Sequence, residues 1–211
     1  MDYKCIDMTQ YKRKQQFEYF SSLAYPYVGV TVNVDITDWL EQIKQNGQPF
    51  FLSFLYAVTR AANAVSEFRQ RILENRIIEF ERCMPSYTVA QEDHGYCYCS
   101  VNCDMPYADF IPYAMKAQEE AKRKASLADG EDVLSLFFVS TSPNITYTAI
   151  VQPVPQPADS NPRITWGRYF VQEGRTLLPV SLLCNHALMD AYHMGLFYEN
   201  LESELQRFEQ N

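Results

Sequence analysis

The stretch NHALMD at residues 185–190 holds two side chains that could perform acid–base chemistry. His186 could act as a general base, because an imidazole changes its charge near neutral pH. Asp190 follows four residues later and could support the imidazole. A structural interpretation competes with this one: Asp190 would cap a helix, contributing on the order of 1 kcal/mol, and His186 would be a hydrogen-bonded core residue. The spacing alone favours the structural interpretation.

Three cysteines at close spacing could suggest a metal site. Cys97, Cys99 and Cys103 lie in the run CYCSVNC, which lacks the second Cys or His pair that zinc sites use. Tyr96 and Tyr98 alternate with two of the cysteines, and this alternation predicts a strand with the thiols on one face. We therefore interpret the cysteines as buried structural thiols and predict no metal.

Glycine-dependent motifs are missing from the sequence. No G-x-G-x-x-G follows a predicted strand, and neither a P-loop nor a G-x-S-x-G elbow occurs. The chain has only 7 glycines, so a glycine-rich loop around nucleotide phosphates is not expected.

The elements that position these residues can be predicted from hydrophobic periodicity. Helices are expected at 10–24, 50–68, 109–129 and 190–208, and Asp38 is expected to cap a further short helix. The helix at 50–68 is apolar on most sides and should be buried. Strands are expected at 27–37, 76–82, 86–92, 96–102, 133–142, 145–152, 163–174 and 177–186.

Strands that cluster in the second half, with long helices between them, predict an α/β fold of the α+β type. We expect two layers, a mixed and largely antiparallel sheet with helices packed on it. The Pro-rich stretch 151–163 is too short to separate domains, so one domain over residues 1–211 is predicted.

Composition limits the partners and the compartment. The net charge of −8 should repel nucleic acid and anionic membranes. The N-terminal residues lack the apolar run of a signal peptide, and no stretch reaches the roughly 20 apolar residues of a membrane span. We expect a soluble, cytoplasmic protein with reduced cysteines. The 15 tyrosines and 13 phenylalanines suggest an aromatic-lined cavity or interface, or a tyrosine-rich core.

The C-terminal segment resembles a known family signature. NHALMDAYHMGLFYENLESEL is similar to the His-His-Ala-Val-x-Asp-Gly-Phe-His motif of chloramphenicol acetyltransferases, at their last strand–helix junction. Further segments resemble that family in the same order: MTQYKRKQQFEYF, VTVNVDIT, FFLSFLYAVTRAANAVSEFRQRI, FFVSTSPNITYTAI and ITWGRYFVQEGRTLLPVSLL. The resemblance covers nearly all of the chain, which is identified as a member of this superfamily.

The resemblance implies a homotrimer with active sites between subunits. Acetyl-CoA and an alcohol would enter a tunnel from opposite ends. His186 would be the base that takes the proton from the alcohol as it attacks the thioester. Ser140 would donate to the tetrahedral oxyanion, and Thr165 would hold a water nearby. Transfer would be direct, without an acyl-enzyme and without a metal.

The resemblance also assigns supporting roles. Asp190 would pair with Arg13 and hold the loop that orients the imidazole. Arg168 and Tyr169 match a basic–aromatic pair near the CoA site, although a solvated hairpin pair explains them equally well. The family's other phosphate-contacting lysine aligns with Pro49, and Lys44 could substitute for it.

The expected acceptor pocket differs from that of the resistance enzymes. Tyr19 and Phe20 preserve an aromatic pair of the family. Tyr96 and Tyr98 lie on a strand where one family position is small. Further departures are Asn185 for the first histidine of the motif, Ala191 for its glycine and Asn144 for a tryptophan.

The sequence therefore predicts an acetyl-CoA-dependent O-acetyltransferase for chloramphenicol or another small alcohol. Two alternatives stay open. One is the catalytic core of a dihydrolipoyl acyltransferase, which shares the fold but would carry a lipoyl domain and linkers, and these are not expected here. The other is a trimeric binding or sequestering protein with weak or no catalysis, which the departures at Asn185, Ala191 and Pro49 keep possible.

Overall fold

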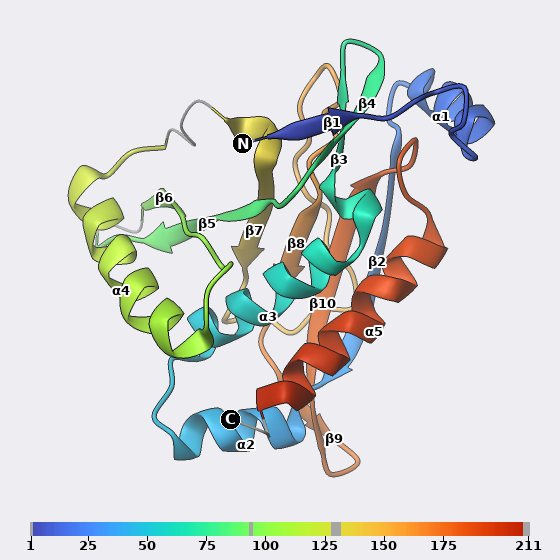
Figure 1. Ribbon diagram of the computed structural model, residues 1–211. Helices are drawn as coiled ribbons and strands as arrows, with labels where there is room; N and C mark the ends of the chain where they lie inside the picture. The colour runs from blue at the N-terminus through green and yellow to red at the C-terminus, as the bar shows by residue number, and fades with distance from the viewer. Residues whose placement is uncertain (1, 93–94, 128–131, 209–211) are drawn as a thin grey trace.

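The computed structural model describes residues 2–92, 95–127 and 132–208 (Figure 1). Their elements follow in chain order: β1 (Tyr3–Cys5), α1 (Lys14–Ser21), β2 (Tyr27–Asp35), α2 (Thr37–Gln45), α3 (Phe50–Ala64), the 3₁₀ helix η1 (Ser66–Arg69), β3 (Gln70–Leu73), β4 (Arg76–Phe80), β5 (Met84–Ala90), β6 (Tyr96–Ser100), α4 (Tyr107–Lys124), the 3₁₀ helix η2 (Val133–Ser135), β7 (Leu136–Thr141), β8 (Arg163–Trp166), β9 (Phe170–Gln172), β10 (Arg175–Asn185) and α5 (Ala191–Arg207).

The main sheet is mixed, as the sequence predicts. Its strand order is β2-β10-β8-β7-β5-β6, and the short β9 pairs with β10 outside this path. β10 runs antiparallel to β2 and β8, whereas β7 runs parallel to β8 and β5. A small second sheet has the order β1-β4-β3. The predicted fold class, a mixed sheet covered by helices, is confirmed.

The helices α3, α4 and α5 lie on one side of the main sheet, with α3 across its middle (Figure 1). The long apolar helix α3 is buried as expected, and Phe54, Leu55, Val58 and Ala61 have no exposed surface. The ring of Phe54 packs on Trp166 of β8, with centroids 5.0 Å apart. This contact fixes which face of β8 points toward the helices, so the next side chain along the strand points to the other face.

The predicted strand at 145–152 is wrong, because these residues form no strand in the structure. Ile145 instead packs against the bend between β8 and β9, where its carbonyl accepts a 2.8 Å hydrogen bond from the amide of Arg168. A Cβ at Gly167 would lie 2.7 Å from the Ile145 carbonyl oxygen, so a glycine allows this approach. The same bend divides the strand predicted at 163–174 into β8 and β9.

Other boundaries differ at element ends and in short strands. β1 and β3 were not predicted, because strands of three or four residues carry too little alternation to be recognised. Asp38 does not cap α2: the cap position is Ile36, and Asp38 lies in the first turn. α4 ends at Lys124, before its predicted end at 129, and residues 128–131 lie outside the described part.

Two glycines allow a matched test of the β2–β10 pairing. Gly29 lies opposite Leu183, and a Cβ there would lie 2.6 Å from the Leu182 carbonyl oxygen. We expect Gly29→Ala to destabilise by about 1–3 kcal/mol, because the backbone of β10 must move. Each kcal/mol corresponds to roughly 2–4 °C in Tm for a chain of this size. Thermal unfolding followed by circular dichroism measures the change.

Gly195→Ala is the control, because a Cβ at this position in α5 meets no atom within 4 Å. Replacing a helical glycine by alanine should raise stability by about 0.5–1 kcal/mol. Equal Tm values for the two variants would contradict the close approach of β2 and β10.

Candidate active site

His186 lies immediately after β10, in the turn that leads into α5. Its amide donates to the Pro26 carbonyl at 2.7 Å, and its ring Nδ1 lies 2.8 Å from the Met189 carbonyl oxygen. A carbonyl only accepts, so Nδ1 carries the hydrogen and Nε2 is the basic nitrogen of the neutral ring. The ring of Phe20 stacks on the imidazole with centroids 3.7 Å apart. The imidazole therefore has a fixed orientation and a fixed tautomer.

Asn185 holds the same turn by its side chain. Its carboxamide oxygen accepts from the amide of Ala187 at 3.0 Å, and its nitrogen donates to the Asp159 carbonyl at 2.9 Å. A buried amide with both ends bonded is a stable anchor. This accounts for one departure from the family signature. Ala191, another departure, is the first residue of α5, where alanine is well tolerated.

Asp190 combines the two roles that the sequence left as alternatives. It caps α5 by accepting from the amide of Tyr192 at 3.0 Å, and it forms a salt bridge with Arg13. Its carboxylate also lies 2.9 Å from Nδ1 of His193. Burial raises the pKa of Asp190, but the hydrogen bond and charge of Arg13 outweigh it, so the pKa is below its ordinary value.

His193 was not among the predicted site residues. Only 6% of it is exposed, and its Nε2 lies 3.6 Å from a carboxylate oxygen of Glu67. The buried imidazole thus lies between the carboxylates of Asp190 and Glu67. Its place three residues after the helix cap is the position from which a side chain bonds back to the cap, and that spacing could have revealed it.

Ser140 and Thr165 lie side by side on the sheet face that points away from α3. They are partners in the β7–β8 register, and their hydroxyl oxygens are 2.9 Å apart. Ser181 of β10 continues this row beside Thr165, followed by Thr31 of β2, whose hydroxyl is 2.7 Å from that of Ser181. One face of the sheet therefore presents a row of hydroxyl groups.

Two residues of the segment 145–152, which was wrongly predicted as a strand, contact Thr165 of this hydroxyl row. The hydroxyl of Thr165 donates to the side-chain oxygen of Gln152 at 3.1 Å. The phenol of Tyr147 donates to the Thr165 carbonyl at 3.1 Å. No pattern in the sequence indicated that Gln152 or Tyr147 would contact Thr165, because the contacts depend on an irregular path.

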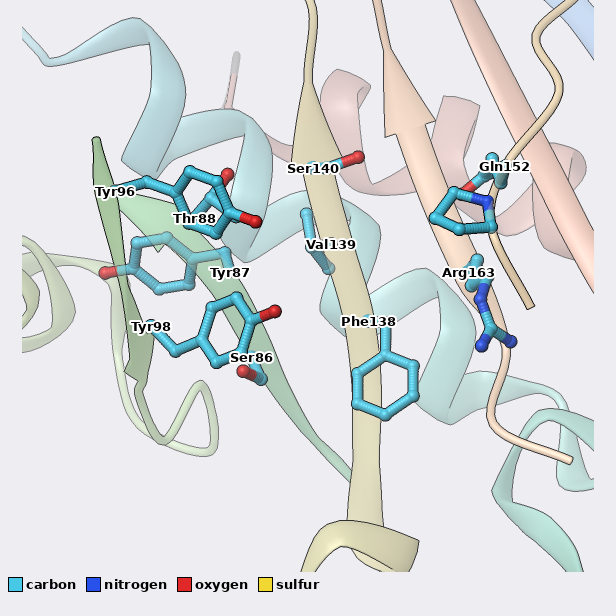
Figure 2. A pocket seen from close by; sticks show the side chains of 11 residues that line it. Ser86, Tyr87, Thr88, Tyr96, Tyr98, Phe138, Val139, Ser140, Gln152 and Arg163 are labelled. Atoms are coloured by element: carbon cyan, nitrogen blue, oxygen red, sulfur yellow. The ribbon is translucent and has the colours of Figure 1, made fainter. Parts of the chain in front are cut away.

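A pocket of about 340 Å³ opens beside Ser140 (Figure 2). Its lining is Ser86, Tyr87, Thr88, Tyr96, Tyr98, Phe138, Val139, Ser140, Gln152, Pro153 and Arg163. The phenol groups of Tyr96 and Tyr98 point toward the strand that carries Ser140, while Cys97 and Cys99 are buried on the other face. The predicted alternation of tyrosines and cysteines is confirmed.

One wall of this pocket holds a neutralised cation. Arg163 donates to both carboxylate oxygens of Asp159, at 2.9 and 2.8 Å. Its guanidinium also lies 5.3 Å from the ring centroid of Phe138. Because the charge of Arg163 is balanced and only 8% of the residue is exposed, the pocket favours uncharged polar ligands over anions.

His186 is remote from this pocket within one chain. Leu183 pairs with Arg163, so the turn with His186 lies beyond that end of β8. Thr165 lies two residues farther along β8 from Arg163, on the side away from His186. Along the chain, His186 is five residues beyond Ser181, which pairs with Thr165, so about 17 Å at 3.3 Å per residue separate the backbone of His186 from the Ser140–Thr165 pair. Phe20 and Tyr19 lie with His186, and the pocket lies with Ser140.

The predicted cofactor residues gather at the bend between β8 and β9. The ring of Tyr169 lies 5.8 Å from that of Phe50 at the start of α3. The ammonium of Lys44 lies 5.7 Å from the centroid of Tyr169, and Arg168 is exposed next to it. Pro49 occupies the cap position of α3. The geometry thus brings a cation beside Tyr169 even though Pro49 is not a lysine.

No described helix is both long and apolar enough to cross a membrane. In the parts of the chain that the structure describes, no group of three or more His, Cys, Asp or Glu side chains is placed to hold a metal ion.

Comparisons with known proteins agree on one family. The sequence model of the family "Chloramphenicol acetyltransferase" matches residues 1–202. A chloramphenicol acetyltransferase from Klebsiella sp is 29% identical over 206 residues, which are 95% of this chain and 92% of that protein. A solved chloramphenicol acetyltransferase structure superposes with a TM-score of 0.85 at 26% identity, covering 97% of this chain and all of that chain.

A more distant group shares the fold alone. The dihydrolipoamide acetyltransferase of Azotobacter vinelandii superposes with a TM-score of 0.68 at 18% identity, covering 93% of this chain and 87% of that chain.

The two roles of Asp190 can be separated by substitution. Asparagine caps helices as well as aspartate does, so Asp190→Asn keeps the cap and removes the charge that faces Arg13. Asp190→Ala removes both, and we expect its free energy of unfolding to be about 1 kcal/mol lower than that of Asp190→Asn, which lowers Tm by roughly 2–4 °C. Thermal unfolding of the three proteins at neutral pH measures this order, and equal Tm values for both variants would contradict the cap.

The lowered pKa of Asp190 predicts the pH dependence of the same comparison. A carboxylate with a folded pKa below 3.8 contributes stability that is fully present above its unfolded pKa and is lost only as pH falls through the folded value. Protonation of this carboxyl should therefore reduce the Tm difference between the wild type and Asp190→Asn only below about pH 5. A difference that disappears above pH 5 would show that the carboxyl is protonated too early.

Proposed function

The chain belongs to the chloramphenicol acetyltransferase family, and from this premise we propose that it transfers the acetyl group of acetyl-CoA to a hydroxyl of a small molecule. The observation that carries the proposal is the hydrogen bond between Nδ1 of His186 and the Met189 carbonyl. In the neutral ring this bond leaves Nε2 as the basic nitrogen, and the stacked Phe20 fixes the plane of the ring, as a general base requires.

His186 and Ser140 would act on opposite ends of the reacting group. Nε2 of His186 takes the proton of the acceptor hydroxyl while its oxygen bonds to the thioester carbonyl carbon. The carbonyl oxygen becomes an oxyanion, to which the Ser140 hydroxyl donates, and Thr165 holds a water beside it. Collapse breaks the carbon–sulfur bond, and the thiolate of CoA takes the proton from the imidazolium. Transfer is direct and proceeds in a ternary complex.

The site is proposed to form between two copies of the chain. The separation of about 17 Å between His186 and the Ser140–Thr165 pair is too long for one proton transfer and one oxyanion contact at the same carbonyl. A neighbouring protomer supplies the missing half. The proposed assembly is a homotrimer, in which each His186 faces the Ser140 of the next protomer.

Acetyl-CoA would bind at the surface made by Tyr169, Lys44 and Arg168. Two cations beside an aromatic ring suit a ligand that carries phosphates and an adenine ring. Lys44 lies over Tyr169 and would supply the charge that Pro49 does not.

The acceptor would enter the pocket of Tyr96 and Tyr98. Chloramphenicol is one candidate, and another uncharged alcohol of similar size is an equal one. Phenol and hydroxyl groups in the lining would select for an acceptor that forms hydrogen bonds with them.

We place the whole chain in one acyltransferase domain and, because all six cysteines are free thiols, in the cytoplasm.

The test of this function is thiol release from acetyl-CoA on adding chloramphenicol or a panel of other neutral alcohols. We expect His186→Ala to lower kcat by about 10²–10⁴-fold, as for loss of a general base. Ser140→Ala should lower kcat by about 10²–10³-fold with little change in KM. Gel filtration and circular dichroism of both variants verify folding. Full activity of His186→Ala would refute the mechanism, and a wild type without acetyl-CoA binding or thiol release would refute the function.

Mixed oligomers test whether the site lies between protomers. His186→Ala and Ser140→Ala proteins are unfolded and refolded together, with each protein refolded alone as the control. An interfacial site predicts that activity returns in the mixture, because some interfaces then pair an intact His186 with an intact Ser140. A site within one protomer predicts no recovery, since every chain lacks one of the two groups.

A further inference from the structure

The Ser140–Thr165 pair shares a limited number of hydrogens. Each hydroxyl carries one hydrogen and can donate it to one acceptor. Thr165 donates to Gln152 Oε1 at 3.1 Å, and its oxygen is 2.9 Å from that of Ser140. Since Thr165 has given away its hydrogen, the bond between the two hydroxyls must be donated by Ser140. Ser140 then presents only lone pairs to the pocket.

The carboxamide of Gln152 can also present its other end. The NH₂ group and the carbonyl oxygen of this amide are similar in size. A half-turn of the amide therefore places the donor where the acceptor was. The Gln152 nitrogen would then donate to Thr165, and Thr165 would donate to Ser140. In this second arrangement the hydrogen of Ser140 is available to a negatively charged oxygen in the pocket.

The surroundings of Gln152 allow such a turn. The side chain is half-buried on the pocket lining, with no helix or strand around its own backbone (Figure 2). Thr165 is fixed independently, because its backbone lies in β8 and its carbonyl accepts from the phenol of Tyr147 at 3.1 Å. The backbone at Thr165 is therefore held while the Gln152 amide turns.

We propose that Gln152 is a positioning residue that sets the direction of the Ser140–Thr165 hydrogen bond. The proposal rests on the proposed function, in which the Ser140 hydroxyl donates to the oxyanion of the tetrahedral intermediate. Gln152 acts through Thr165 and contacts neither the acetyl group nor the acceptor oxygen in this role. No covalent bond changes; only the direction of two hydrogen bonds is reversed.

A variant that can only accept tests the direction. Gln152→Glu forces Thr165 to donate to the carboxylate, so Ser140 stays committed to Thr165. At neutral pH we expect kcat to fall by about 10²-fold, as for loss of an oxyanion donor, while KM for acetyl-CoA changes little. The ratio of variant to wild-type kcat should rise as pH is lowered, because a protonated carboxyl can donate again. Gln152→Met removes both functions but leaves Thr165 able to donate to Ser140, so its loss of kcat should be smaller than that of Gln152→Glu.

The negative charge of Gln152→Glu near the oxyanion would also slow the reaction. Repeating the substitution in a Thr165→Val protein separates this charge effect from the effect of hydrogen-bond direction. In Thr165→Val the hydroxyl that transmits the direction is gone, but the charge of Gln152→Glu remains. We expect Gln152→Glu to cause little further loss of kcat in this background. An equal loss in both backgrounds would attribute the effect to charge and overturn the proposal. A loss in Gln152→Met as large as in Gln152→Glu would overturn it too.

The assay measures thiol release from acetyl-CoA with chloramphenicol, with each alcohol of the same panel and with water alone as acceptor. A wild type that releases no thiol with any of them would contradict the proposed function. Neutron diffraction from wild-type crystals decides the hydrogen-bond direction without turnover. A Thr165 deuterium on the line to Gln152 or to Ser140, with the matching end of the amide facing it, supports the proposal. A Thr165 deuterium directed at neither residue overturns it.

Discussion

The register of β10 is the constraint on which the rest of the structure depends. Side chains alternate between the two faces of a strand, so a shift by one residue would exchange the faces of the whole strand. In the observed register Val180 and Leu182 face the helices, and Ser181 lies beside Thr165 in the hydroxyl row. The same strand ends at Asn185 and thereby places the imidazole of His186 at one end of the sheet. The two chemical groups thus have a fixed separation that only a second chain can bridge in the proposed mechanism.

Electrostatic contacts fix the imidazole from the other side of the turn. Asp190 connects α1 to the start of α5 through Arg13, and the buried His193 connects Asp190 to Glu67. A partly buried carboxylate with a lowered pKa keeps its charge through the pH range in which an imidazole titrates. The Asp190–Arg13 ion pair therefore keeps both of its charges when His186 gains or loses a proton. In the proposed mechanism Asp190 supports the imidazole, and no proton has to pass through it.

Much of the fold could be predicted from periodicity, and the failures have physical causes. The apolar run of α3 and the alternation of β2 and β10 can be recognised in the sequence, because burial of a helix or of one strand face requires those patterns. The alternation around Tyr147 led to a wrong strand prediction, because this segment is irregular in the structure. Pro153 and the two prolines soon after it have no amide hydrogen to donate to a sheet. His186, Ser140 and Thr165 were found through the family resemblance. Gln152 was not, because a contact made through an irregular segment leaves no trace in local spacing. His193 was missed although its spacing from Asp190 is that of a capping box.

The stacking of Phe20 on His186 has a consequence for dynamics. α1 has eight residues, of which only Phe17 is buried, and Tyr19 on its surface is 63% exposed. Short helices with few buried contacts open locally at a small free-energy cost, far below that of global unfolding. Each opening of α1 would remove both Phe20 and Arg13 from the turn and release the imidazole from its fixed plane. The fraction of molecules with an oriented His186 imidazole is then set by the local opening equilibrium of α1, which amide hydrogen exchange reports.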